Sequence, residues 1–350
     1  MRYRAVPHVG DWEASLVGNL IMHDIRDRDG SVRVAKGRLI GREDVECLRA
    51  LEWAEVHIAE LARADVHEDE AGAQLACAAA GAGVRVGERT AGHWPLVGTR
   101  RGIVDVAVDT LSDVNAREGL SVYTLYHGHI VDSGEIVARA KITPFAVPGA
   151  LLASALRSAR AAGGLVRVRE FHRVVVGAVV QESLAARNQT MVGRLAKTLG
   201  EKVRWLGGDL LPPAVVEGGR DAVAAALRAQ VAANAGVIVV AGTRAMDELD
   251  PAFLALADLG AERVRHGVPA HPGSLFWIAR LGRVAVLGLP TCGLFSEATV
   301  FDLVLPRILC GDEIGAAELA ALGHGGFLTR DMAFRFPPYR PTQRRGEVID

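Results

Sequence analysis

The chain of 350 residues has few of the features that mark secreted, membrane or nucleic-acid-binding proteins. Its four cysteines include no CxxC pair with metal-ligand or redox spacing. No run approaches the roughly 18 uncharged apolar residues that a membrane span requires, and the amino-terminal residues lack the apolar core of a secretory signal. The 40 basic and 41 acidic residues nearly cancel, so the charge excess that nucleic acids or anionic membranes attract is missing. These absences predict a soluble, cytoplasmic protein that binds small molecules or proteins.

The composition is that of a folded protein of two or three domains. Half of the residues are hydrophobic, and 39 glycines and 14 prolines are near ordinary usage. Residues 1–164 predict an α+β region of one or two subdomains, with a helix over 43–51 and a hairpin turn at Asp132-Ser133-Gly134. The Ala-rich interval 65–87 is open to two interpretations. It is either a helix followed by a loop, or an arm that packs on another subunit.

From about residue 165 to 330, strand-like and helix-like segments alternate. Residues 173–180 and 236–240 are nearly unbroken apolar runs, which is typical of strands buried on both faces. A helix is predicted over 189–199, ended by Gly200, and a strand over 202–206. The predicted fold class is α/β, with a mostly parallel sheet covered by helices on both faces, followed by a tail at 331–350. Ligands of such sheets bind at the carboxyl ends of the strands.

The loop after the second buried strand is the most informative. Residues 241–250 read AGTRAMDELD and lead into a helix at Pro251. A small-residue loop at this place lets backbone N–H groups approach a phosphate or another oxyanion, and Thr243 and Arg244 add donors. Asp250 before Pro251 is typical of a helix N-cap, so its role as a cap stands beside any functional role.

Two further loops are expected at the same sheet edge. Residues 266–274 hold His266 and His271, whose spacing favours hydrogen bonding within the loop over metal ligation. Residues 287–293 precede a helix and include Cys292, for which no partner base is identifiable. Three loops that converge make a pocket more probable than one loop does.

The order and spacing of these loops resemble a known family. Residues from about 166 to 306 are similar to the molybdopterin-binding domain of the molybdopterin molybdotransferases, the molybdenum insertases that include the gephyrin E domain. That family has loops like SGGxSxGxxD, HGVxxxPGKP and LPGNPxS, and this chain has AGTRAMDELD (241–250), HGVPAHPGSL (266–275) and LPTCG (289–293). The family's TGDEL element is echoed by residues 180–183, and its following turn by residues 186–188.

The resemblance implies the ligand, the site residues and the assembly. The ligand would be molybdopterin, with or without an adenylyl group, and Mg²⁺ and molybdate would join it if the protein is catalytic. Glu182 and Asp250 fall at the family's acidic positions near the metal-insertion site, and a homodimer is expected. The implied pterin-binding residues are Asn188, Gly242, Thr243, Arg244, Pro272, Gly273, Ser274, Pro290, Thr291, Cys292 and Gly293.

Departures from the family pattern leave the function open. Gly242-Thr243 replaces a double glycine and Ser274 replaces a lysine, and both changes weaken oxyanion binding. The resemblance implies either a molybdotransferase that inserts molybdate into adenylylated molybdopterin, or a carrier or assembly factor without chemistry. A third alternative keeps the fold and changes the ligand, as in nucleotide-cleaving relatives that share this domain. Asp250→Asn is expected to distinguish the first two, since asparagine retains a capping oxygen and removes the charge.

Overall fold

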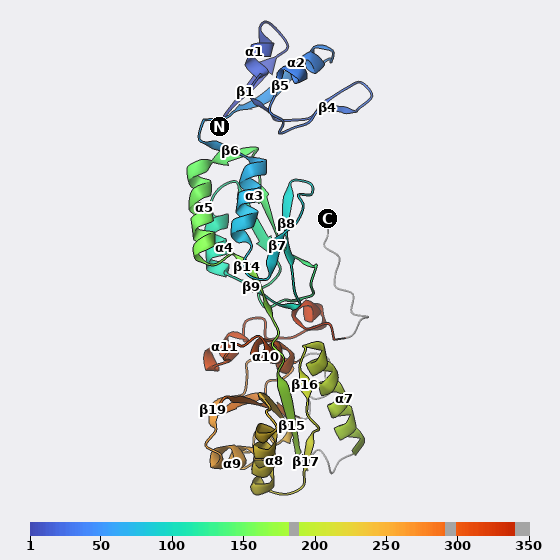
Figure 1. Ribbon diagram of the computed structural model, residues 1–350, viewed down its shortest axis with the longest axis vertical. Coiled ribbons are helices and arrows are strands. Elements are labelled where there is room, and N and C mark those ends of the chain that lie inside the picture. Colours follow the sequence, from blue (N-terminus) through green and yellow to red (C-terminus); the bar gives the residue numbers. More distant parts are fainter. Residues whose placement is uncertain (182–188, 291–298, 340–350) are drawn as a thin grey trace. The chain divides into compact units, whose positions relative to one another are not determined.

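The computed structural model describes residues 1–181, 189–290 and 299–339, and the chain divides into two compact units (Figure 1). Unit 1 consists of Met1–Arg100, Val104–His127 and Val131–Val168, and unit 2 of Arg101–Ile103, Gly128–Ile130 and Arg169–Asp350. The fold is of the mixed α/β class, as the sequence predicts.

Residues 1–60 of unit 1 form small sheets and two helices around one apolar cluster. The elements are β1 (Arg2–Pro7), α1 (Trp12–Leu16), β2 (Leu20–Ile21), β3 (Ile25–Arg26), β4 (Val32–Val34), α2 (Arg42–Arg49) and β5 (Glu55–Glu60). Strand β5 lies between β1 and β2, antiparallel to both. Helix α2 confirms the prediction over 43–51, because Val45 and Leu48 bury one face of it.

The rest of unit 1 packs helices on a second antiparallel sheet. The elements over residues 65–170, of which β9, β11 and β14 have residues in both units, are β6 (Asp65–His67), α3 (Glu68–Ala79), β7 (Val84–Val86), β8 (His93–Gly98), β9 (Gly102–Val106), α4 (Val108–Asn115), β10 (Leu120–Thr124), β11 (Ile130–Val131), β12 (Ile136–Ile142), β13 (Ala146–Pro148), α5 (Gly149–Ala161) and β14 (Val166–Glu170). The sheet has the order β10-β12-β8-β7. Helix α3 buries Leu75 and Ala79 in the core of this unit, so the interval 65–87 holds a helix of the core rather than an arm for another subunit.

The hairpin predicted around residues 132–134 is wrong. Strand β11 belongs to the sheet β11-β9-β14, whereas β12 lies in the four-stranded sheet. Both edges of β12 are already paired, with β10 on one side and β8 on the other. The turn residues are present, but β11 has no free edge of β12 to join.

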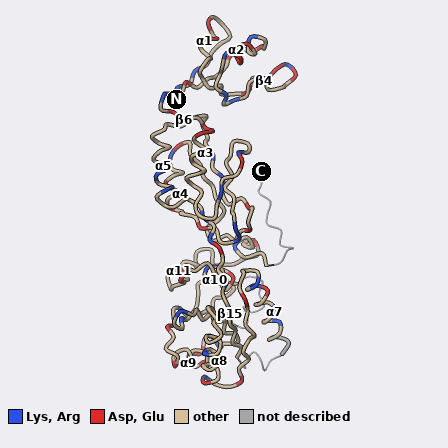
Figure 2. Tube along the Cα trace, in the orientation of Figure 1, with Lys and Arg blue, Asp and Glu red and all other residues tan. Residues whose placement is uncertain are grey.

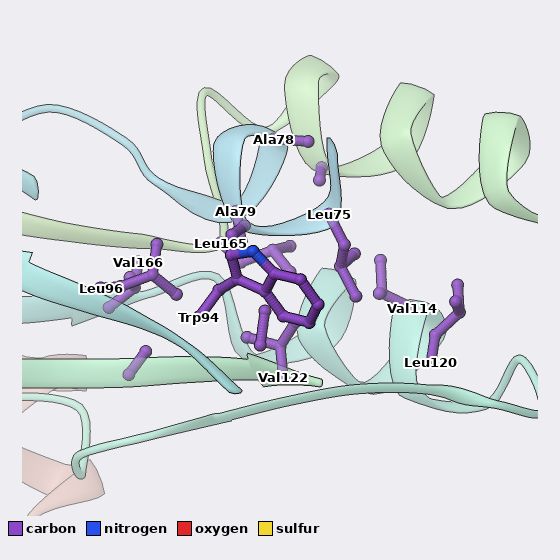
Figure 3. Close-up of a cluster of buried hydrophobic side chains, with 14 of the residues drawn as sticks. Leu75, Ala78, Ala79, Trp94, Leu96, Val114, Leu120, Val122, Leu165 and Val166 are labelled. Atoms are coloured by element: carbon purple, nitrogen blue, oxygen red, sulfur yellow. The ribbon is translucent and has the colours of Figure 1, made fainter. Parts of the chain in front are cut away.

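Helix α3 comes very close to Trp94, whose indole lies in the core of unit 1 (Figure 3). A Cβ at Gly72 in α3 would lie 2.1 Å from Cζ3 of this indole. We expect Gly72→Ala to lower the free energy of unfolding by about 2 kcal/mol, because overpacking outweighs the gain in helix propensity. Gly193→Ala is the matched control, since a Cβ there meets nothing within 4 Å.

Urea unfolding of the two variants measures these effects. Gly193→Ala is expected to raise the free energy of unfolding by up to about 1 kcal/mol, as alanine does in an open helix position. A gain of stability in both variants would contradict the close packing of α3 on Trp94.

Unit 2 is built on one seven-stranded sheet. Its elements are β15 (Val175–Gln181), α7 (Gln189–Trp205), β16 (Asp209–Leu210), β17 (Ala214–Val216), α8 (Arg220–Ala232), β18 (Val237–Thr243), α9 (Pro251–Asp258), β19 (Glu262–His266), β20 (Trp277–Leu281), β21 (Val284–Pro290), α10 (Val300–Leu309), α11 (Ala316–Ala321) and the 3₁₀ helix η1 (Arg330–Arg335). The sheet order is β16-β15-β18-β21-β20-β19, and β17 also pairs with β15.

The sheet of unit 2 is mixed, so the mostly parallel sheet predicted for residues 165–330 is seen in part. Strand β15 pairs in parallel with β16, β17 and β18, and β18 pairs in parallel with β21. Strand β20 runs antiparallel to β21 and to β19. The two-residue connection Gly282-Arg283 explains the antiparallel pair of β20 and β21, since a parallel pair needs a long crossover.

Helices pack on both faces of this sheet. Along β18, Val237 and Val239 join a cluster with α7 and α10, and the alternating residues Ile238 and Val240 join a cluster with α8 and α9. Among the described residues, no helix has the length and apolar character needed to cross a membrane.

The end of α7 corrects another prediction. Residues 202–206, predicted as a strand, are the last turn of α7 and the residue that follows it. Leu199, Val203 and Leu206 are buried at helical spacing and extend one apolar stripe. Gly200 does not end the helix, because the stripe continues past it.

Candidate functional site

The strands next to the loops singled out in the sequence meet at one edge of the seven-stranded sheet. Thr243, the last residue of β18, is the register partner of Pro290, the last residue of β21. Trp277, the first residue of β20, is paired with Gly288 of β21. The loop before β20, residues 267–276, therefore lies at the same edge as the ends of β18 and β21. Strand β15 also ends there, since Val180 pairs with Ala241.

Two glycines have backbone conformations that the loops require. Gly242 has φ +86° and Gly273 has φ +116°, in the region that L-residues rarely adopt. A Cβ at Gly273 would lie 2.9 Å from Cβ of Val300, and the N–H of Val300 donates to the carbonyl of Pro272 at 3.2 Å. The Pro272-Gly273 backbone thus lies directly on the first turn of α10.

Asp250 is the N-cap of α9 and is fully buried. Its Oδ1 accepts from the backbone N–H of Ala252 and from Nε2 of Gln181, both at 3.0 Å. Its Oδ2 accepts from the backbone N–H of Arg244 at 2.8 Å and lies 3.7 Å from Nε of the same residue. Both carboxylate oxygens are therefore engaged by the protein, and the cap interpretation is confirmed.

The remaining predicted site residues differ in how exposed their side chains are. The hydroxyl of Thr243 is buried and accepts from Nε1 of Trp277 at 3.4 Å, so this side chain links the ends of β18 and β20. The side chain of Arg244 is 64% exposed, and Nη1 lies 3.5 Å from Oδ2 of Asp247. Ser274 is exposed. The predicted residues Glu182, Asn188, Thr291, Cys292 and Gly293 lie outside the described residues.

The described residues include one of the two acidic side chains that the resemblance places near the metal-insertion site, because Glu182 lies outside them. Both oxygens of the other, Asp250, accept hydrogen bonds from the protein. Within the ranges 1–181, 189–290 and 299–339, no group of three or more His, Cys, Asp or Glu side chains is arranged to hold a metal ion.

Comparisons with known proteins give structural neighbours only. No family profile matches the sequence, and no curated protein matches it. A molybdenum cofactor biosynthesis protein from Pyrococcus furiosus is 12% identical, with a TM-score of 0.26 over 89% of this chain and 65% of that one. A molybdopterin biosynthesis protein from Pyrococcus horikosii is also 12% identical, with a TM-score of 0.31 over 89% of this chain and 75% of that one. These are molybdenum cofactor proteins. This chain spans less than two thirds of the length of the first.

An ion-pair cluster joins the loop after β18 to strand β19, and the sequence did not reveal it. Nη1 of Arg263 lies 2.6 Å from Oε2 of Glu248, and Nδ1 of His266 lies 3.5 Å from Oε1. The hydrogen bond from Arg263 holds the pKa of Glu248 below its usual value. His266 therefore faces a carboxylate, in agreement with a hydrogen-bonding role.

A second ion pair, also unforeseen, lies between two helices that flank the candidate site. Nζ of Lys202 in α7 is 2.7 Å from Oδ1 of Asp302 in α10. The Lys202 side chain is 11% exposed and that of Asp302 is 0% exposed. Basic and acidic residues are otherwise interspersed over both units (Figure 2), mostly at exposed positions.

Proposed function

We propose that this chain binds molybdopterin, free or adenylylated, at the carboxyl edge of its seven-stranded sheet, and that it acts in molybdenum cofactor biosynthesis. One observation carries the proposal. The strands that flank the three segments resembling the pterin-binding loops of the molybdotransferases meet at one sheet edge, through the pairing of Thr243 with Pro290 and of Trp277 with Gly288.

The chemistry of this edge suits a phosphate-bearing ligand. Parallel strands end there, and Gly242 has a positive φ, a backbone conformation that favours glycine at the end of β18. The exposed guanidinium of Arg244 adds a positive charge beside this backbone. Charge and backbone donors together would bind the phosphate end of the pterin.

The state of Asp250 favours a protein that holds the pterin over one that transforms it. The carboxylate is buried and accepts three hydrogen bonds, so its helix cap and its contacts with Gln181 and Arg244 account for it without a catalytic role. The molybdotransferase alternative is tested with purified protein and adenylylated molybdopterin. We expect no molybdate-dependent release of AMP, and release above a buffer control would establish the transferase instead.

Native mass spectrometry tests the proposal itself. The protein is purified without oxygen from cells that make molybdopterin, and is sprayed under non-denaturing conditions. We expect a bound mass equal to molybdopterin or its adenylylated form. A protein that is empty, and that also takes up no added molybdopterin, would contradict the proposal.

A further inference from the structure

The buried pair Lys202–Asp302 connects helix α7 to the first turn of helix α10. Oδ1 of Asp302 accepts from Lys202 at 2.7 Å. Oδ2 accepts from the backbone N–H of Thr299 at 2.9 Å and from its hydroxyl at 3.3 Å. Oγ1 of Thr299 in turn accepts from the N–H of Phe301 at 3.2 Å. One carboxylate thus holds both the helix cap and the neighbouring helix.

Aromatic rings cover the ammonium group of Lys202. Its Nζ lies 5.2 Å from the ring centre of Tyr339 and 5.9 Å from that of Phe301. These distances permit cation–π attraction, and the rings limit the access of water to the ion pair. The ammonium group of Lys202 therefore donates to Asp302, since few water molecules can reach it to accept its hydrogen bonds.

The turn that Asp302 holds is the turn on which the candidate site rests. Val300 donates its N–H to Pro272, and Gly273 lies against the Val300 side chain. Gly273 and Val300 are packed so closely that there is no room for a Cβ atom on Gly273. A shift of the first turn of α10 would therefore move the Pro272-Gly273 backbone with it.

A buried ion pair is a weak source of stability, because desolvation of the two charges offsets most of their attraction. Such pairs can instead select one geometry. We infer that Lys202 is a positioning residue for the site, acting through Asp302 and the first turn of α10 on the loop 267–276. The expected effect of Lys202 on ligand affinity rests on the proposed function. Its expected effect on the loop 267–276 does not.

The test uses a double variant that keeps the fold and removes the link. Lys202→Met with Asp302→Asn removes both charges together, and the asparagine oxygen can still accept from Thr299. Lys202→Arg retains a donor for Asp302 and is the conservative rescue. Lys197→Met, at an exposed position of the same helix, is the matched control.

Hydrogen–deuterium exchange is first measured in the free proteins. We expect the double variant to retain its melting temperature within a few degrees, while amides of 267–276 and the first turn of α10 exchange about tenfold faster, the size of effect that supporting contacts have at binding sites. Lys202→Arg and Lys197→Met should exchange like the wild type. Unchanged exchange in the double variant would overturn the inference.

Calorimetry with molybdopterin is the second measurement. The double variant is expected to bind about tenfold more weakly, with affinity retained in Lys202→Arg and Lys197→Met. Faster exchange together with a wild type that binds no molybdopterin would refute the proposed ligand and leave the positioning role standing. Wild-type affinity in the double variant would refute the positioning role and leave the ligand standing.

Discussion

Asp250→Ala is expected to lower the free energy of unfolding by about 3 kcal/mol. The substitution removes a helix cap, which by itself costs roughly 1 kcal/mol, and leaves buried donors of Arg244, Ala252 and Gln181 without their acceptor. Urea denaturation followed by circular dichroism measures the change. The effect should appear as a lower midpoint with an unchanged slope.

Asp247→Ala is the matched control for this prediction, because it changes the same residue type in the same loop. Asp247 is exposed, and its Oδ1 accepts from the N–H of Leu249. Its loss is expected to cost less than about 1 kcal/mol. Equal effects of the two substitutions would contradict the structural role of the Asp250 carboxylate.

From the sequence alone, Asp250→Asn is predicted to leave the stability nearly unchanged, because asparagine retains a capping oxygen. The structure predicts a loss of stability instead. The buried carboxylate accepts on both oxygens, so an amide NH₂ must face either the N–H of Arg244 or the N–H of Ala252. Two donors facing each other leave a buried backbone group unsatisfied, at a cost of about 1–2 kcal/mol. A loss of activity in this variant would therefore not by itself identify a catalytic carboxylate.

Gly242→Ala is expected to weaken the binding of molybdopterin about a hundredfold. A methyl group at this position would stand where the proposed function places the phosphate, and small displacements at binding sites have effects of this size. Alanine is preferable to valine here, because φ is +86° and a β-branched residue would be strained as well. Calorimetry under anoxic conditions measures the affinity.

Gly260→Ala separates loss of binding from backbone strain. Gly260 also has a positive φ, +68°, and a Cβ there meets nothing within 4 Å. Both alanine variants should lose about 1–2 kcal/mol of stability from the left-handed conformation. Only Gly242→Ala should lose affinity. A similar loss of affinity in both would place the anion away from Gly242.

The sequence predicted those parts of the fold that local signals determine. The unbroken apolar runs of β15 and β18 identified buried strands, and Asp250-Pro251 marked the start of α9. The prediction was wrong where residues distant in the sequence determine the end of a helix or the pairing of a strand. The apolar stripe of α7 outweighed Gly200, and the paired edges of β12 left no place for β11.

The candidate site shows the same division. The order of the loops was readable, because each follows a recognisable strand. The partners of Asp250 and Asp302 were not, since Gln181 and Lys202 lie 69 and 100 residues away from them in the chain. One signal was available and was missed. The connection Gly282-Arg283 is too short for a crossover, so it already requires β20 and β21 to be antiparallel.

The most direct measurement is hydrogen–deuterium exchange of the wild-type protein with and without molybdopterin, under anoxic conditions. A pterin bound at the carboxyl edge of the seven-stranded sheet should slow exchange in residues 241–250 and 267–276 and leave unit 1 unchanged. Absence of protection at saturating molybdopterin, or protection confined to unit 1, would contradict the proposed ligand site.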